Sequence, residues 1–230
     1  MNLFITGANR GLGFSLTKQA VKRGHRVYAC MRAKNARQEE LTKLSDAYPE
    51  QVQLLLLDVL NEESIVSAKA ELQKQNKEVN VIINNAAVLN ESRANLDELA
   101  MEEGLLAMDV NVLGPVRVAK HFLPLLTGER KTIINISSDA GSISNTYGGN
   151  YFYGMSKAAL NMFSEKLRLT YPDIRVFSIH PGWMHTDMGG EKAPLDPDIA
   201  ADGILDILEG KTVTDSAHSY IDYTGKKYPF

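Results

Sequence analysis

A tyrosine and a lysine stand four residues apart in the segment Tyr153–Lys157, which reads YGMSK. The segment opens an Ala- and Leu-containing stretch with helical spacing, and on a helix side chains four positions apart lie on the same face. A tyrosine hydroxyl has an ordinary pKa of about 10, which makes it a poor acid or base at neutral pH. A cation held one helical turn away stabilises the phenolate and lowers that pKa. The pair could then exchange a proton with a carbonyl oxygen while a hydride is transferred at the neighbouring carbon.

This spacing alone is weak support for a catalytic pair, because nine tyrosines and an ordinary lysine frequency give roughly 0.6 chance matches in such a chain. A second copy of the pattern runs from Tyr223 to Lys227. It follows a predicted strand and contains a glycine, so its two side chains need not share a face. We therefore expect the functional pair to be Tyr153 and Lys157.

A serine could hold the same carbonyl oxygen as the tyrosine. Ser138 closes the run Asn135-Ile136-Ser137-Ser138 at the end of a predicted strand. In an open α/β sheet the carboxyl ends of the strands face the ligand crevice. A serine pair at a strand end also serves in caps and turns, and the sequence leaves both roles open.

Three glycines separate the first apolar run from the first helical run, in Thr6–Gly13 (TGANRGLG). Glycine costs roughly 0.5–1 kcal/mol more than alanine inside a regular element, so these glycines indicate a backbone that side chains would obstruct. The N–H groups and positive dipole end of a helix start favour an anion, and missing Cβ atoms let a pyrophosphate touch the backbone. A tight turn without a ligand is the alternative. The position between a strand and a helix favours a nucleotide site.

The residues expected near the ribose favour NADP(H) over NAD(H). In dinucleotide-binding sheets an acid at the end of the second strand bonds the ribose 2′-hydroxyl of NAD, whereas an arginine nearby suits the 2′-phosphate of NADP. The second predicted strand is followed by Arg32, with no acid before Glu39. Arg10, inside the glycine segment, can converge on the same point. Two arginines can neutralise and bond a phosphate dianion, although either alone would be an ordinary surface residue.

Short apolar runs alternate with longer helical runs along the chain. The predicted strands are Leu3–Thr6, Arg26–Met31, Val52–Asp58, Val79–Asn84, Thr132–Ser137, Arg175–His180 and Ser219–Asp222. The predicted helices are Gly11–Arg23, Glu62–Gln75, Met101–Leu126, Tyr151–Thr170 and Pro197–Leu208. Most strand runs are continuously apolar, which is typical of strands buried on both faces. The alternation predicts a single-domain Rossmann-type α/β fold over residues 1–230, with a doubly wound, mostly parallel seven-stranded sheet and helices on both faces.

Composition and charge argue against several classes of protein. The chain has 230 residues, of which 44% are hydrophobic and 23% charged, as is ordinary for a globular protein. Its formal net charge of −3 gives no reason to expect a nucleic-acid or anionic-membrane partner, and no apolar run approaches the ~18 residues of a membrane span. A single cysteine, Cys30, and a strand that begins too early to leave room for a signal peptide predict a cytoplasmic protein. The five histidines lack metal-ligand spacing, so no metal is expected.

Five motifs occur in order along nearly the whole chain. They are Thr6–Gly13, Asp58-Val59, Asn84-Asn85-Ala86, the set of Asn111, Ser138, Tyr153 and Lys157, and Pro181-Gly182 with Thr186. Together they resemble the short-chain dehydrogenase/reductase family. The resemblance implies that Tyr153 is the acid/base and that Ser138 orients the carbonyl. It also implies that Lys157 tunes the tyrosine and binds the nicotinamide ribose, and that Asn111 anchors a water relay to Lys157.

The same resemblance implies a set of cofactor-binding residues. They are Gly7, Asn9, Arg10, Gly11, Leu12, Gly13, Arg32, Asp58, Val59, Asn85, Ala86, Ala87, Tyr153, Lys157, Pro181, Gly182 and Thr186. A basic residue before the second glycine of the loop and another at the end of the second strand mark the NADP-preferring members. Arg10 and Arg32 match these positions, so NADP(H) is the expected cofactor.

Two segments resemble one branch of the family most closely. Pro181–Gly190 (PGWMHTDMGG) and the terminal DYTGKKYPF look like the C-factor/sniffer-like carbonyl reductases. The chain departs from the family pattern at Ala87, where a glycine is usual. It also departs at Ser138, which lies fifteen positions before Tyr153 where thirteen is commoner, so a slightly longer intervening loop is expected.

We expect an NADPH-dependent oxidoreductase that reduces a small apolar aldehyde or ketone, with Tyr153 as general acid. The loops expected over the nicotinamide carry largely apolar side chains, namely Ile143, Tyr147, Phe152, Trp183, Met184 and Met188. The short stretch after Thr186 predicts an open pocket. The alternative is an NADP-binding signalling or regulatory protein with little or no turnover. A homodimer is also predicted, through the helices Met101–Leu126 and Tyr151–Thr170.

Overall fold

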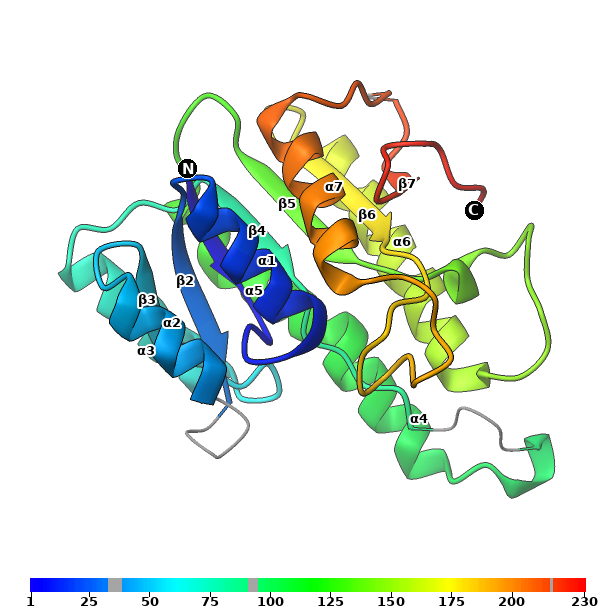
Figure 1. Cartoon of the computed structure of the whole chain (residues 1–230). Helices are drawn as coiled ribbons and strands as arrows, with labels where there is room; N and C mark the ends of the chain where they lie inside the picture. Colours follow the sequence, from blue (N-terminus) through cyan, green and yellow to red (C-terminus); the bar gives the residue numbers. More distant parts are fainter. Residues whose placement is uncertain (33–38, 91–94, 216) are drawn as a thin grey trace.

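The computed structural model describes residues 1–32, 39–90, 95–215 and 217–230. In these ranges seven strands form one sheet in the order β3-β2-β1-β4-β5-β6-β7, and every neighbouring pair is parallel (Figure 1). The strands are β1 (Asn2–Ile5), β2 (Arg26–Met31), β3 (Val52–Leu56), β4 (Val81–Asn84), β5 (Thr132–Ile136), β6 (Arg175–His180) and β7 (Tyr220–Asp222).

The strands are largely apolar because both faces of the sheet are covered. In β1, Leu3 and Ile5 belong to one hydrophobic core, whereas Phe4, between them, belongs to the other. β2 divides in the same way, with Ala29 in the first core and Tyr28 in the second. Successive side chains of a strand point to opposite faces, so one continuous apolar run supplies both cores.

Helices cover both faces of this sheet. α1 (Gly11–Lys22), α2 (Glu39–Ala47) and α7 (Pro197–Glu209) pack on one face. α3 (Glu62–Lys74), α5 (Gly114–Phe122) and α6 (Tyr151–Thr170) pack on the other, and α4 (Met101–Met108) lies against α6. In Figure 1, α1 and α7 lie side by side in front of the sheet, with α3 and α5 behind it. The predicted single-domain, doubly wound α/β fold is therefore confirmed.

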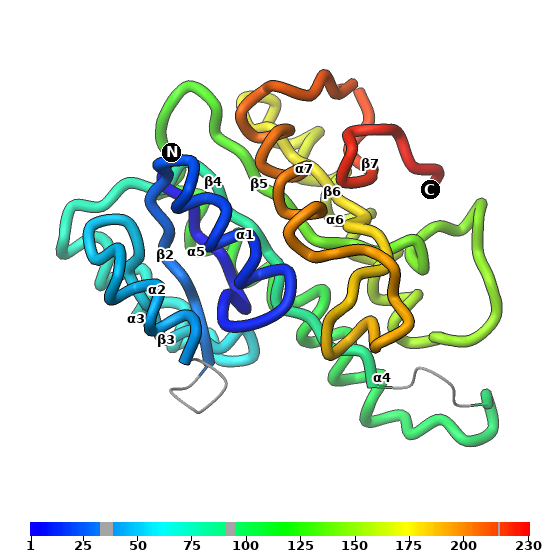
Figure 2. Tube along the Cα trace, in the orientation of Figure 1, coloured from blue at the N-terminus to red at the C-terminus, as the bar shows by residue number. Residues whose placement is uncertain are grey.

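The strand order reverses between β1 and β4. In open α/β sheets the ligand crevice lies at the carboxyl ends of the strands, at such a point of reversal. The β2 arrow in Figure 1 points to the lower edge of the view, which is therefore the carboxyl edge. Figure 2 shows the segment between β6 and α7, and α4 below it, at this edge. The fold thus brings distant loops to the place where the motifs predict a site.

The predicted helix Met101–Leu126 is divided into shorter elements. The chain forms α4, a π-helix (Asp109–Leu113), α5 and a 3₁₀ turn (Leu123–Leu125). Pro115 explains the interruption, because it has no N–H to donate to the carbonyl of Asn111 four residues earlier, and its ring crowds that carbonyl. Short π-helical segments of this kind are frequent at functional sites.

α2 is a helix that the apolar pattern does not predict. Leu41 is its buried residue, and Leu44 is partly buried against the same core. Two apolar positions in nine residues make too short a repeat to distinguish a helix from a loop.

Candidate active site

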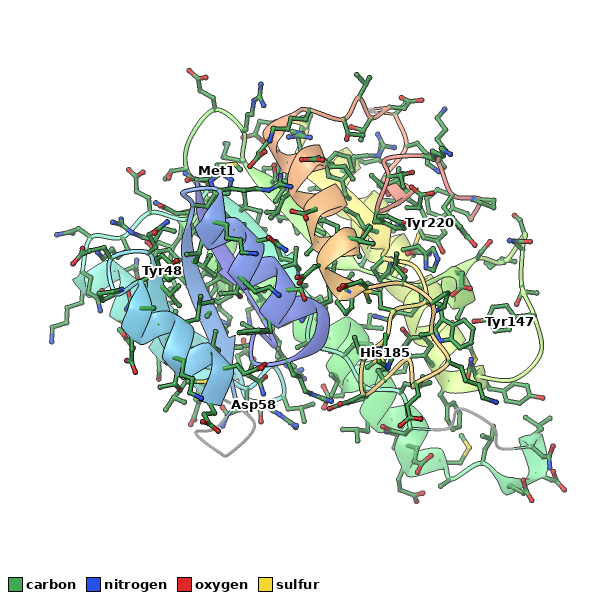
Figure 3. All side chains as sticks on the ribbon, viewed as in Figure 1. Met1, Tyr48, Asp58, Tyr147, His185 and Tyr220 are labelled. Carbon is green, nitrogen blue, oxygen red and sulfur yellow. The ribbon has the colours of Figure 1, made fainter. Side chains whose placement is uncertain are left out.

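A cavity of about 1070 Å³ opens at the carboxyl edge of the sheet. Its lining runs from the loops after β1 and β3, past the end of β5, to the start of α6. Pockets for drug-sized ligands measure roughly 300–1,000 Å³, so this volume suits an extended ligand such as a dinucleotide. Figure 3 labels two of the lining residues, Asp58 and Tyr147, which lie well apart along this edge.

The glycine segment has a backbone that side chains would obstruct. Gly7 and Gly11 have φ angles of +65° and +52°, in the left-handed region that favours glycine. A Cβ on Gly13 would lie 2.2 Å from the Gly7 carbonyl oxygen, so a side chain there would push α1 away from the turn. Asn85 Nδ2 donates to the carbonyl oxygens of Thr6 and Gly7, at 2.9 and 3.1 Å, and fixes the turn against the end of β4. The first residues of α1 line the cavity, where the helix start favours an anion.

Two arginines belong to the lining of the cavity. Arg10 and Arg32 are exposed residues of its lining. Arg10 Nη1 lies 2.9 Å from Asp187 Oδ2, but both side chains are exposed, by 47% and 66%, so this ion pair is weak. Backbone N–H groups for a pyrophosphate and two arginines for a further phosphate fit a phosphorylated dinucleotide.

The predicted cofactor-binding residues are brought together in this cavity. All of them except Gly13 belong to its lining, and Gly13 lies beneath the turn. Apart from Tyr153 and Lys157, the lining members are Gly7, Asn9, Arg10, Gly11, Leu12, Arg32, Asp58, Val59, Asn85, Ala86, Ala87, Pro181, Gly182 and Thr186.

Tyr153 and Lys157 both line the cavity, from the first two turns of α6. Lys157 is 2% exposed, and its Nζ donates to the Ile136 carbonyl oxygen at 2.7 Å. The same Nζ lies 5.4 Å from the centre of the Tyr153 ring. α6 approaches the end of β5 closely because Gly141 lacks a side chain, since a Cβ there would lie 2.8 Å from the backbone carbon of Lys157. The predicted pair therefore faces the cavity that also holds the glycine turn.

Burial opposes the pKa tuning that the sequence predicts. It raises the pKa of Tyr153 to about 12, although a hydrogen bond with Ser138 acts in the opposite direction. It lowers the pKa of Lys157 to about 7, because a buried ammonium is poorly solvated. The expectation that the Tyr153 pKa lies below its ordinary value is therefore wrong. At neutral pH Tyr153 keeps its proton and is placed to donate it.

Ser138 has both of the roles that the sequence leaves open. It follows β5 and caps the short 3₁₀ turn Asp139–Gly141, where its Oγ accepts a hydrogen bond from Ala140 N at 3.3 Å. The same Oγ donates to Asp139 Oδ1 at 2.8 Å. Ser138 also lines the cavity beside Tyr153.

Asn111 lies beneath the cavity rather than on its wall. It is 1% exposed and belongs to the π-helix. Its Oδ1 accepts from Val88 N at 2.9 Å, and its Nδ2 donates to Val88 O and Ser156 Oγ at 3.0 Å each. Because Pro115 has no N–H, the Asn111 carbonyl is released from α-helical bonding. The water relay to Lys157 stays a prediction.

The family model described as short chain dehydrogenase matches residues 2–195. The chain belongs to this family. C-signal of Myxococcus xanthus is 36% identical over 159 residues, which are 66% of this chain and 93% of that protein. Retinol dehydrogenase 16 of Mus musculus is 33% identical over 188 residues, 80% of this chain. The chain spans only 57% of the length of that retinol dehydrogenase.

Two solved structures match this short-chain dehydrogenase over its whole length. NADPH-bound carbonyl reductase from chicken fatty liver is 30% identical, with a TM-score of 0.89 over 100% of this chain and 98% of that one. Carbonyl reductase Sniffer of D. melanogaster is 30% identical, with a TM-score of 0.91 over 100% and 99%. With C-signal, they confirm the resemblance to the C-factor/sniffer-like branch of the short-chain dehydrogenases/reductases.

The second tyrosine–lysine pattern of the chain lies outside the site. Tyr223 follows β7 and packs near Gly182 and Gly203. Lys227 Nζ forms an ion pair with Asp215 Oδ2 at 2.6 Å. Neither residue belongs to a helix, and neither lines the cavity, so the first copy is the one at the site.

The lining and supporting residues that were absent from the predicted set include four polar ones. Asp139, Asn150 and His180 line the cavity, and the Tyr220 hydroxyl donates to the Ser138 carbonyl oxygen at 2.5 Å. The first and third follow or end a strand at the carboxyl edge, which is a usable signal. Asn150 and Tyr220 reach the site through tertiary packing, for which the sequence gives no local signal.

Four of the six residues expected around the substrate line the cavity, namely Tyr147, Trp183, Met184 and Met188. The other two do not, because Ile143 is 77% exposed and Phe152 is buried against Gly104. In the described ranges, no helix has both the length and the apolar character needed to cross a membrane.

Proposed function

We propose that the protein is an NADP(H)-dependent oxidoreductase of the carbonyl reductase type, which reduces a small aldehyde or ketone to an alcohol. One observation carries the proposal: Ser138, Tyr153 and Lys157 line the same cavity as the glycine turn and the two arginines. The similarity to carbonyl reductases, one of them NADPH-bound, supports it. Trp183 and the neighbouring methionines offer apolar contacts for the hydrocarbon part of the substrate.

Residues at both ends of the cavity hold NADP(H). The start of α1 binds the pyrophosphate, Arg10 and Arg32 bind the 2′-phosphate, and Asp58 and Val59 contact the adenine. Pro181, Gly182 and Thr186 border the nicotinamide, on the side where Ser138 and Tyr153 lie. When bound, NADPH supplies the hydride for the carbonyl carbon.

Side chains of the protein donate the proton that the carbonyl oxygen gains and help to replace it. Tyr153, which is protonated at neutral pH, donates its proton to the carbonyl oxygen. The Ser138 hydroxyl, which donates to Asp139 Oδ1 in the structure, turns to that oxygen when substrate binds and orients it through a hydrogen bond. The Lys157 ammonium stabilises the phenolate that remains, and Asn111 anchors the water relay that returns a proton to Lys157.

Consumption of NADPH with a panel of aldehydes, ketones and quinones tests this function. We expect oxidation of NADPH with at least one class of carbonyl, and much slower oxidation with NADH in its place. Binding of NADPH, seen as a change in its fluorescence, without any consumption across the panel contradicts the proposal.

That negative result would favour the alternative, an NADP-binding signalling or regulatory protein. The similarity to a protein named C-signal gives this reading its support. Tyr153 and Lys157 count against it, because binding of the dinucleotide alone needs the glycine turn and the arginines but no proton donor.

We also propose that two copies associate through α4 and α6. Both helices expose large apolar side chains: Met101 and Leu105 on α4, and Met155, Met162 and Leu169 on α6. A monomer seldom leaves so much apolar surface in contact with water. Sedimentation at micromolar concentration should show a dimer, and a single 25.4 kDa species would refute the association.

We also propose a single domain, a small-molecule partner and a cytoplasmic location. Residues 1–230 form one dinucleotide-binding and catalytic domain, because the cavity takes its lining from Gly7 to Gly190. Its partner is a small carbonyl compound rather than a nucleic acid or a membrane, and its compartment is the cytoplasm. Fractionation and limited proteolysis test the compartment and the single domain.

A further inference from the structure

The substrate end of the cavity is more polar than the sequence predicts. Beside Ser138, the wall carries Asp139, Tyr147, Asn150 and His180. The apolar residues of the wall come from the segment after β6 instead. One side of the site therefore suits a polar group close to the carbonyl of the substrate.

Asp139 places a carboxylate next to the proposed catalytic serine. Its Oδ1 accepts hydrogen bonds from Ser138 Oγ at 2.8 Å and from Ala140 N at 2.9 Å. Its ion-pair contact within the described ranges is with His180, whose Nδ1 lies 3.9 Å from Oδ1. That Nδ1 accepts the Asp139 N–H at 2.9 Å, and burial lowers the His180 pKa, so the ring is neutral. No described cation therefore neutralises the carboxylate within ion-pair distance.

Asn150 adds a second acceptor to this wall. It precedes α6 with φ +49° and ψ +42°, a left-handed backbone that is uncommon for a residue other than glycine. Its side chain does not cap the helix. Its Oδ1 is shielded from solvent and accepts no hydrogen bond from any described residue. A buried acceptor without a donor is unfavourable, so this position calls for a ligand that supplies one.

Tyr147 connects these two acceptors and orients the amide. Hydrogen bonds with Asn150 and Asp139 affect its pKa in opposite directions. Because Asn150 Oδ1 accepts no hydrogen bond from a described residue, the amide NH₂ is the donor to the tyrosine oxygen, in agreement with the lowering of the Tyr147 pKa by this bond. Because the NH₂ group is used on Tyr147, Oδ1 is the atom of this lining side chain that lacks a hydrogen-bond partner among the described residues.

We propose that Asp139 and Asn150 select substrates that carry a hydrogen-bond donor on the carbon next to the carbonyl, as in α-hydroxy ketones and α-hydroxy aldehydes. The inference rests on the proposed function and names the substrate class of the same site. The carbonyl oxygen takes its place at Ser138 and Tyr153, and the neighbouring hydroxyl donates to the Asp139 carboxylate, or to Asn150 Oδ1 once that side chain turns toward the cavity. A substrate with a carboxylate at that carbon is repelled by Asp139.

The reaction balances without a further reagent. The C=O π bond breaks as the carbonyl carbon gains a hydride from NADPH and its oxygen gains the Tyr153 proton. The products are a vicinal diol and NADP⁺, and solvent restores the proton of Tyr153. The selecting hydroxyl is unchanged by the reaction.

Four small ketones of similar size test the selection: hydroxyacetone, methoxyacetone, 2-butanone and pyruvate. Methoxyacetone keeps the electron-withdrawing oxygen of hydroxyacetone but has no donor, so it separates hydrogen bonding from carbonyl reactivity. We expect kcat/KM, measured by NADPH oxidation, to be at least about 10-fold higher for hydroxyacetone than for methoxyacetone or 2-butanone. Pyruvate should be the poorest substrate.

Substitutions in the cavity wall test which residues cause the preference for hydroxyacetone. Asp139→Asn and Asn150→Gly should each lower the ratio of hydroxyacetone to methoxyacetone several-fold, and glycine keeps the left-handed backbone of Asn150. Asn76→Gly is the matched control, because Asn76 has the same backbone region (φ +51°) and is exposed far from the cavity lining. In this control, the ratio of kcat/KM for hydroxyacetone to that for methoxyacetone should equal the wild-type ratio. Methoxyacetone turnover reports any damage to Ser138 itself.

The outcomes separate this inference from the function on which it rests. Equal kcat/KM for hydroxyacetone and methoxyacetone, or an unchanged ratio in both cavity variants, overturns the inference. Reduction of other carbonyls but not of hydroxyacetone also overturns it and leaves the carbonyl reductase proposal standing. No consumption of NADPH with any carbonyl removes the proposed function instead.

Discussion

The two ends of the cavity are built in different ways. At the cofactor end one continuous segment, Thr6–Gly13, makes the turn, and backbone contacts at Gly7 and Gly13 determine its shape. At the substrate end, the wall beside Ser138 is assembled from side chains of separate segments, among them Asp139, Asn150 and His180. An anion site of backbone N–H groups can be specified by a short sequence, whereas a substrate wall depends on how distant loops pack.

The largest expected effect is a loss of turnover without a loss of cofactor binding. Tyr153→Phe removes the proton donor but keeps the ring, so turnover of any accepted carbonyl should fall by at least about 10²-fold. The Kd for NADPH should stay close to that of the wild type, because the phenol is not among the groups that hold the phosphates. Steady-state kinetics and fluorescence titration measure the two quantities, and undiminished turnover would remove the proposed mechanism.

Two glycine substitutions, one at each end of the cavity, should also affect cofactor binding and catalysis separately. In Gly13→Ala the new Cβ meets the Gly7 carbonyl oxygen at 2.2 Å, so the turn must shift and the Kd for NADPH should rise about 10-fold or more. In Gly141→Ala the new Cβ meets the Lys157 backbone at 2.8 Å, which displaces α6 from Ser138. This second variant should lose kcat, by about 10-fold or more, with a smaller change in Kd. Equal effects on both constants in both variants would show that the two ends are not independent.

The arginines should give a smaller, cofactor-specific effect. Arg10→Ala or Arg32→Ala should weaken binding of NADPH by about 10-fold, which is the scale of one charge-assisted hydrogen bond, and leave binding of NADH unchanged. Arg26→Ala is the matched control, because Arg26 begins β2 at the opposite edge of the sheet. Equal weakening of NADPH and NADH by the cavity variants would contradict the assignment of the 2′-phosphate.

The fold and the cofactor end were predictable because their signals are local. Continuous apolar runs such as Leu3–Ile5 identify doubly covered strands, and glycine spacing identifies the turn. The division of the helix after Met101 follows from Pro115, a signal that is visible in the sequence but that the long apolar pattern obscured. A mostly parallel sheet with helices on both faces needed no more than this alternation.

The substrate end was only partly predictable, for a physical reason. Ser138 and Tyr153 could be recognised by their type and position, but the apolar character expected for the wall overlooked Asp139 and Asn150. Asn150 owes its role to a left-handed backbone and to a shielded oxygen, neither of which an isolated sequence shows. The same limitation applies to pKa values, because the burial that reverses the expected shift of Tyr153 is a tertiary property.

The pH dependence of turnover should follow Lys157. Because burial lowers its pKa to about 7, the ammonium is present below neutral pH and is lost as the pH rises. The rate of carbonyl reduction should therefore fall on the alkaline side of about pH 7, by up to about tenfold per pH unit. Lys157→Arg stays charged, so whatever activity it retains should lack this alkaline decline. A rate that does not change between about pH 6 and about pH 9 would contradict a role for the ammonium.

The stability of the protein should show the opposite pH trend. The folded Lys157 has a pKa of about 7 against an ordinary 10.5, so between these values the unfolded chain binds one more proton than the folded one. The free energy of unfolding therefore rises with pH across this window, and below about pH 7 the full penalty of the buried charge remains. Lys157→Met removes the penalty together with the catalytic ammonium, so at about pH 7 the inactive variant should be more stable than the wild type, by about 1–3 kcal/mol. Urea unfolding should show that this stability advantage narrows as the pH approaches about 10. A variant that is less stable than the wild type at every pH would mean that the hydrogen bond from Lys157 to the Ile136 carbonyl outweighs the cost of desolvation.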